Sequence, residues 1–134
     1  MSNYIWAVSA GGTITGGGGV TNNSVIVTWT STGAQSVSVI YTNGNGCTAA
    51  AAIIHNVTVN ILPVPTITGP SPICAATAGN VYTTEAGMTN YLWTVSSRGT
   101  ITAGGGTGAN TVTVTWTTAG ARSVSVNYTN LTNC

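Results

Sequence analysis

The sequence predicts an all-β protein built from antiparallel β-sandwich units in tandem. Two observations predict this fold class. Short segments alternate apolar and polar residues, as in YIWAV at 4–8 and VIVTW at 25–29, and no segment shows a helical period. Such alternation, with β-branched and aromatic residues on one face, is typical of half-buried strands. The second observation is a long internal repeat.

Residues 3–47 align without a gap onto residues 90–134, with 28 of 45 positions identical and an offset of 87 residues. The matched pairs include Tyr4 and Tyr91, Trp6 and Trp93, Trp29 and Trp116, Tyr41 and Tyr128, and Cys47 and Cys134. A period of 87 residues is too long for one coil of a solenoid and matches a small β domain. The chain therefore contains parts of two similar units.

The alternating pattern continues along the chain. VSVIY at 37–41 and NVTVNIL at 56–62 alternate like the first two segments, with Val57, Val59 and Ile61 facing inward. Short strands are expected at 66–68 and 80–84. The second copy repeats the pattern at 91–95, 111–117 and 123–129, and Trp6 and Trp93 lie in mid-strand, where we expect core positions. Turns such as TNGNG and TAGAR separate these segments, as in an antiparallel sandwich.

The four prolines set the boundary between the units. All of them lie in LPVPTITGPSP at 62–72. Proline cannot donate to a central strand ladder, so this segment is predicted to be a linker that runs into an edge strand. We expect residues 1–62 to be the C-terminal portion of one repeat without its front strands. Residues 63–134 are then the following repeat without its last strand.

Two glycine runs, GTITGGGG at 12–19 and GTITAGGG at 99–106, raise the question of a phosphate-binding loop. A Walker-type loop needs a lysine, and the chain has none. A dinucleotide fingerprint needs a following helix, whereas a strand pattern follows here. Glycine also permits positive φ in tight reversals between strands. The runs are therefore interpreted as turns that recur with the repeat.

Charge is almost absent: Arg98, Arg122 and Glu85 carry all of it, and His55 is the only imidazole. Nucleic-acid binding depends on clustered Lys and Arg, so it is not expected. General acid–base catalysis usually needs two positioned titratable groups, so no enzyme, catalytic residue or cofactor is predicted. No apolar run reaches 18 residues, so membrane insertion is not expected, and Met1 does not open a signal-peptide pattern.

The order of motifs resembles a known family. PTITGPSPIC, VYTTEAG, YLWTV, TVTVTW, GARSVSV and a closing NC are similar to the PKD-like and immunoglobulin-like tandem repeats of large secreted or cell-surface, adhesin-type proteins of gliding bacteria. The resemblance implies immunoglobulin-like (PKD-like) β-sandwich repeats in tandem. It also implies an extracellular structural or adhesive role, often with export by the type IX route, and no shared binding site.

The chain has three cysteines, and their positions in such a sandwich indicate how they pair. Cys74 precedes the predicted strand at 80–84 and Cys134 follows the strand at 123–129, so we expect a disulfide between them. Cys47 is the counterpart of Cys134, and its expected partner lies upstream of Met1. A metal site is the alternative, but the cysteines lack CxxC spacing and one histidine cannot complete a convincing site. A disulfide indicates an extracellular setting.

The sequence thus predicts a non-enzymatic extracellular structural or adhesive repeat of a long fibrous protein, whose partners are neighbouring repeats or copies of itself, or a glycan or cell surface. Two alternatives stay open. A self-complementing filament would use β-strand addition through the segment around 53–62, with Ile53, Val57, Val59 and Ile61 as exchanged residues. A carbohydrate-binding adhesin would use Trp29 and Trp116, which end their strands and are expected to reach the sandwich edge.

Overall fold

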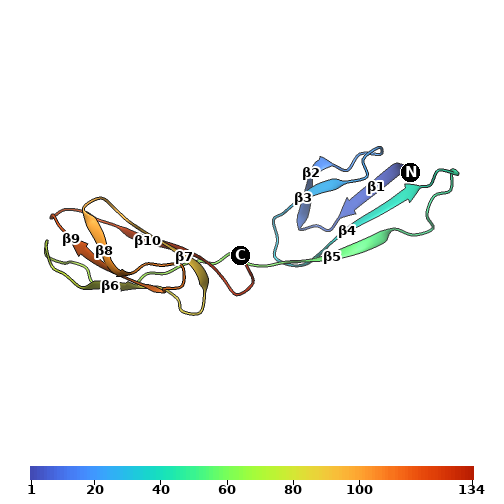
Figure 1. The fold of residues 1–134 in the computed structure, drawn as a ribbon. Helices are drawn as coiled ribbons and strands as arrows, with labels where there is room; N and C mark the ends of the chain where they lie inside the picture. Colours follow the sequence, from blue (N-terminus) through green and yellow to red (C-terminus); the bar gives the residue numbers. More distant parts are fainter. The chain divides into compact units, whose positions relative to one another are not determined.

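The computed structural model describes all 134 residues and contains ten β-strands and no helix. No helix is therefore present that could cross a membrane. The chain divides into two compact parts, Met1–Ile61 and Leu62–Cys134, which we call unit 1 and unit 2 (Figure 1). All strand pairs are antiparallel, so the all-β antiparallel fold class is confirmed.

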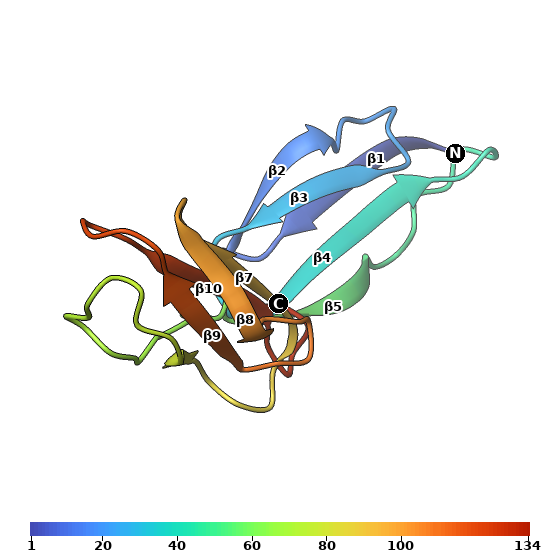
Figure 2. The ribbon, with the colours of Figure 1, turned by 60° about the vertical axis from the view of Figure 1, so that its left-hand side comes forward.

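Unit 1 consists of two antiparallel sheets. Its strands are β1 (Ser2–Val8), β2 (Gly12–Gly17), β3 (Val25–Trp29), β4 (Gly33–Thr42) and β5 (Ile53–Val59). One sheet has the order β1-β4-β5 and the other pairs β2 with β3 (Figure 2). Trp6 lies opposite Val39 in the first sheet, so the apolar residues of β1 and β4 share a face, as their alternation predicts.

Unit 2 repeats this plan with two changes. Its strands are β6 (Asn80–Thr83), β7 (Thr89–Val95), β8 (Gly99–Gly104), β9 (Thr111–Trp116) and β10 (Val124–Thr129). The sheets have the orders β6-β9-β8 and β10-β7. β6 therefore adds a strand to β9 that β3 lacks, while β10 lacks the partner that β5 provides to β4.

Seven of the nine predicted strands lie inside observed ones or extend one residue beyond them, and there are three larger differences. The strand expected at 56–62 begins at Ile53 and ends at Val59, so Ile61 lies outside it and is exposed. The strand expected at 66–68 is reduced to one bridge between Thr68 and Thr83. The GTIT stretches, which were interpreted only as parts of turns, form β2 and β8.

Pairing with β5 changes the length of the strand that receives it. β4 has ten residues and β10 has six. The additional part of β4, Gly33–Ser36, pairs with Val59–Asn56 of β5. The corresponding residues 120–123 of unit 2 are not in a strand. Four residues of nearly the same sequence are thus extended only where a neighbouring strand holds them.

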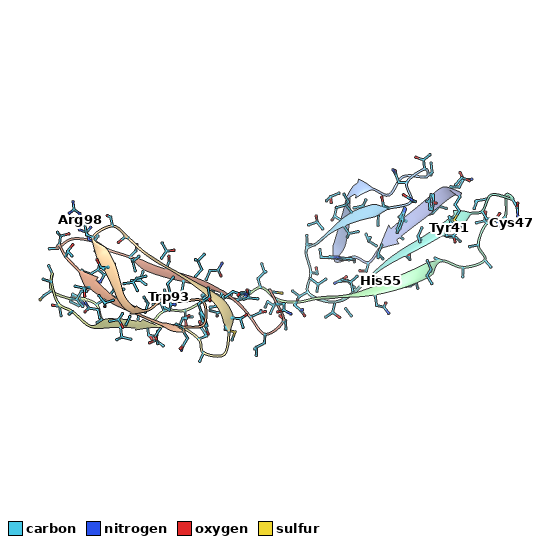
Figure 3. The ribbon with its side chains drawn as sticks, in the orientation of Figure 1. Tyr41, Cys47, His55, Trp93 and Arg98 are labelled. Carbon is cyan, nitrogen blue, oxygen red and sulfur yellow. The ribbon has the colours of Figure 1, made fainter.

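The buried core lies entirely in unit 2. Its members are Tyr91, Trp93, Val112, Val114, Trp116 and Tyr128. Their counterparts in unit 1, which are the same residue types, are all half-exposed: Tyr4, Trp6, Val25, Val27, Trp29 and Tyr41. The core position expected for Trp93 is confirmed (Figure 3), whereas Trp6 is only half-buried.

The difference in burial has a local cause. Ile73, Tyr82 and Met88 pack against the core of unit 2. All three belong to residues 62–88, which we call the covering arm. Apart from its last residue, Met88, which the offset of 87 pairs with Met1, the arm has no counterpart in unit 1. Removing apolar area from water stabilises a fold by about 25 cal/mol per Å². The covering arm therefore supplies much of the hydrophobic stabilisation of unit 2.

The second half of each glycine run forms a turn, as the sequence predicts. Gly17 and Gly104 have φ of 63° and 66°. A Cβ at Gly17 would lie 2.5 Å from the Ser24 carbonyl oxygen, and one at Gly104 would lie 2.3 Å from that of Thr111. Only glycine fits such a position, so the runs are explained by the β2–β3 and β8–β9 turns.

Gly99 has a separate role, because the ring of Trp116 lies directly against it. A Cβ at Gly99 would be 2.5 Å from Cζ3 of Trp116. We therefore expect Gly99→Ala to displace the ring and to lower the free energy of unfolding of unit 2 by about 1–3 kcal/mol, as for other overpacked cores. Urea unfolding followed by tryptophan fluorescence measures this.

Gly106→Ala is the matched control, since nothing lies within 4 Å of a Cβ at that position. It should leave the unfolding midpoint nearly unchanged. Equal effects of the two substitutions would contradict the ring contact as the reason for Gly99.

Candidate functional site

The densest polar cluster surrounds Glu85, the only acidic side chain of the chain. The Thr66 backbone N–H donates to both carboxylate oxygens, at 3.1 and 3.2 Å, and the Thr66 hydroxyl donates to Oε1. The Thr84 hydroxyl donates to Oε2 at 2.7 Å, and the Tyr128 hydroxyl does so at 3.1 Å. One carboxylate therefore joins the start of the covering arm to β10.

Tyr91 extends this cluster to β7. Its hydroxyl donates to the Glu85 backbone carbonyl at 2.7 Å and accepts from the Met88 backbone N–H at 3.0 Å. The rings of Tyr91 and Tyr128 lie edge to face with centroids 5.7 Å apart, a favourable geometry for aromatic pairs. We call Glu85, Thr66, Thr84, Tyr91 and Tyr128 the Glu85 clasp. Its contacts connect both ends of the covering arm to the β10-β7 sheet.

The electrostatics of the clasp favour a permanent carboxylate. The hydrogen bond from the Thr66 hydroxyl, followed by that from Thr84, lowers the pKa of Glu85 from 4.5 to about 2. Desolvation, with a smaller contribution from Glu85, raises the pKa of Tyr128. Near neutral pH the carboxylate accepts hydrogen bonds and the tyrosine donates one. The clasp is therefore suited to holding the arm.

An open hollow of about 390 Å³ lies at the other end of unit 2. Its lining includes Pro72, Cys74, Trp116 and Arg122. The Arg122 guanidinium donates to the Thr118 hydroxyl at 2.7 Å and to the Ala119 carbonyl at 3.2 Å. The only charged group in the wall is thus hydrogen-bonded within its own turn.

The two tryptophans considered for glycan stacking differ in exposure. Trp116 is only 3% exposed, and its indole N–H donates to the Tyr82 hydroxyl at 3.3 Å. The expectation that this ring reaches the sandwich edge is wrong, because the covering arm and Gly99 enclose it. Trp29 is half-exposed, with its ring against Gly12. Neither offers the fully open ring face that sugar stacking requires.

All three cysteines are free, so the disulfide expected between Cys74 and Cys134 is not formed in this structure. The physical reason is their placement. Cys74 lines the hollow together with Val124, the first residue of β10, whereas Cys134 bonds to Asn130, just after the last residue of β10. Six residues of strand span about 17 Å at 3.3 Å per residue, far more than the ~7 Å that a disulfide tolerates between Cα atoms.

Both units match one protein family. A comparison with protein families finds the PKD-like domain over residues 1–55 and 60–134. The chain belongs to the PKD-like domain family. No curated protein and no solved structure matches the chain. PKD-like domains are typically non-enzymatic immunoglobulin-like modules and are usually extracellular.

In the first PKD-like unit, the residues considered for strand exchange lie mainly in β5. Ile53, Val57 and Val59 pair with Val39, Gln35 and Gly33 of β4. His55 lies on the same strand opposite Val37 and is exposed (Figure 3). Cys47 lies in the loop between β4 and β5. No three of the histidine, cysteine and glutamate side chains lie close enough together to hold a metal ion.

Sequence reasoning about the PKD-like units did not find the Glu85 clasp. Thr66 and Tyr128 lie 19 and 43 positions from Glu85, so no local motif links them. The one signal was Glu85 itself. Ordinary solvated surfaces carry many charges. A single carboxylate in a chain that is almost without charge therefore indicates that specific hydrogen-bond donors surround it.

Protonation of Glu85 at acidic pH should lower the thermal stability of the second PKD-like unit, unit 2. The folded-state pKa of about 2 lies below the ordinary 4.5, so the contribution to stability is fully present above pH 4.5 and is lost as the pH falls toward 2. We expect the thermal midpoint of unit 2 to be constant from pH 7 to 5 and to fall below that range. Glu85 is the only titrating acidic side chain, which makes the assignment direct.

Glu85→Gln is the control, since glutamine keeps the shape but not the titration. This variant should be less stable at pH 7 and should lose less stability on acidification. An unchanged acid response in Glu85→Gln would contradict the role of the clasp.

Proposed function

We propose that this chain is a stretch of a tandem array of PKD-like repeats that forms a non-enzymatic structural or adhesive part of a long extracellular surface protein. The resemblance of its motifs to repeats of large adhesin-type proteins of gliding bacteria supports this context. The match of both units to one domain family supports the array.

One observation carries the proposal. The same six framework side chains are buried in unit 2, where the covering arm lies over them, and half-exposed in unit 1. Unit 1 contains a β5 strand and no covering arm, and unit 2 contains the arm and no β5 counterpart. Each unit therefore has what the other lacks, as expected for repeats that adjoining sequence completes. Half-exposed core residues are otherwise costly, since apolar surface in water favours association.

The contacts that the two units share are also those of a scaffold. The indole N–H of Trp6 donates to the Asn22 carbonyl at 3.0 Å, and that of Trp93 donates to the Ala109 carbonyl at 2.9 Å. Repetition preserves these packing contacts.

The unpaired edge of β10 supports a second arrangement, a filament assembled by β-strand addition. β5 is the donor that fits, because it already pairs with β4, which repeats the sequence of β10. Each chain, however, has one β5 and two strands that accept it. A β5 that moves to the β10 of another copy leaves its own β4 unpaired, so exchange gains no strand pair. Because exchange adds no strand pair, the covalent array is favoured over the filament.

An antiserum against the 134-residue chain tests the array and its location together. In extracts of cells that make the protein, the array predicts a band much larger than the 13.4 kDa of this chain. Protease added to intact cells should remove that band, because the repeats lie outside, and a cytoplasmic marker protein should survive as the control. A band near 13 kDa that resists external protease would contradict the proposal.

A further inference from the structure

The loop between β4 and β5 contains the only two Asn-Gly pairs of the chain. It lies wholly within unit 1, at the end that carries Cys47 (Figure 3). An asparagine before a glycine is chemically reactive, because no side chain on the glycine shields its backbone nitrogen from the asparagine amide. Sequence alone predicts similar reactivity for the two pairs, which are Asn43 with Gly44 and Asn45 with Gly46.

The structure holds the side chain of the first asparagine. Oδ1 of Asn43 accepts hydrogen bonds from the backbone N–H groups of Asn45 and Cys47, at 2.9 and 3.0 Å. Asparagine side chains that bond in this way to the backbone ahead of them stabilise tight turns. The amide of Asn43 must therefore break two hydrogen bonds before it can rotate toward the nitrogen of Gly44.

The second asparagine is held less firmly. The side chain of Asn45 is exposed, and no hydrogen bond engages it. Gly46 follows with a φ of 80°, and nothing lies within 4 Å of the position that a Cβ would take there. The Gly46 backbone N–H donates to the Asn43 carbonyl at 3.1 Å. Attack by this nitrogen on the amide of Asn45 thus requires the loss of one hydrogen bond, and not two.

We propose that Asn45 is a site of spontaneous covalent modification, which converts to aspartate and isoaspartate through a succinimide, whereas the fold of the loop preserves Asn43. The backbone nitrogen of Gly46 attacks Cγ of Asn45 and loses its proton. The Cγ–Nδ2 bond breaks, and the amide nitrogen leaves with that proton as ammonia. Water then adds to either carbonyl carbon of the succinimide and opens the ring by breaking a C–N bond. Nothing is oxidised or reduced, and water is the only co-reactant.

The modification changes the charge and the hydrogen bonding of the loop. A neutral amide becomes a carboxylate, so the formal net charge of +1 falls by one to 0, and Glu85 is no longer the only acidic side chain. A net charge of zero favours association between copies. Isoaspartate also inserts one carbon atom into the backbone after position 45. This insertion alters the spacing on which the bond from the Cys47 N–H to Asn43 depends.

Unit 2 forms the same turn without an Asn-Gly pair. Asn130 takes the place of Asn43 and accepts from the backbone N–H groups of Thr132 and Cys134, each at 3.0 Å. The fold of the loop therefore does not require the glycines, and unit 2 supplies replacements that suit this turn. The residues Leu131, Thr132 and Asn133 correspond to Gly44, Asn45 and Gly46.

The test incubates the intact chain in warm neutral buffer made with heavy-oxygen water, which labels each carboxylate formed. Isoelectric focusing measures the acidic form, and tandem mass spectrometry locates the label. We expect Asn45 to convert about fivefold faster than Asn43, which is the equivalent of one hydrogen bond. In urea, where the loop is unfolded, the two asparagines should convert at similar rates.

Two variants taken from the loop of unit 2 separate the pairs. Gly46→Asn should nearly abolish conversion at position 45, because a side chain then shields the attacking nitrogen, and asparagine tolerates the positive φ. Gly44→Leu is the matched control and should leave conversion of Asn45 unchanged. Nothing lies within 4 Å of a Cβ at either glycine, so both variants should fold.

Faster conversion of Asn43, equal rates for the two asparagines in the folded chain, or no conversion would overturn the proposal. Loss of conversion at Asn45 in Gly44→Leu would overturn it too. None of these results concerns the size or the protease sensitivity of the cellular protein, so a failure here leaves the array proposal to its own test.

Discussion

The structure depends on one constraint: an apolar framework repeated twice in the sequence is closed only where another segment lies over it. The covering arm brings Ile73, Tyr82 and Met88 onto the aromatic and valine side chains of unit 2. The same side chains in unit 1 are half-exposed. Burial in this chain is thus a property of the segment that covers the framework as much as of the framework itself. Neighbouring sequence then becomes a structural partner, as the proposed array requires.

Scarcity of charge determines how the arm is held. Glu85 accepts hydrogen bonds from Thr66, Thr84 and Tyr128. These bonds favour the ionised carboxylate and engage both of its oxygens. Hydrogen bonds to a charged acceptor are stronger than those between neutral groups, so one carboxylate is an effective clasp. The remaining surface is neutral and polar, and it puts little electrostatic repulsion between copies or repeats.

The period-two alternation and the internal repeat predicted the features that depend on local sequence. The strands β1, β3, β9 and β10, the repeat and the core position of Trp93 follow from alternation and self-alignment. β2 and β8 were missed because glycine lowers strand propensity, although pairing with β3 and β9 holds them extended. The clasp and the burial of Trp116 depend on the arm, which contacts them from distant positions. The expected Cys74–Cys134 bond assumed that neighbouring strands place their cysteines at the same end, and the direction of β10 places them at opposite ends.

The central claim is that the covering arm, and not the framework sequence, closes the core. The indole N–H groups of Trp6 and Trp93 test it most directly, because each donates to a backbone carbonyl at the same relative position, at 3.0 and 2.9 Å. Hydrogen exchange of these two groups, followed by NMR on the intact chain, compares the same bond with and without the arm. The account predicts clearly slower exchange for Trp93. Equal rates, or slower exchange for Trp6, would contradict it.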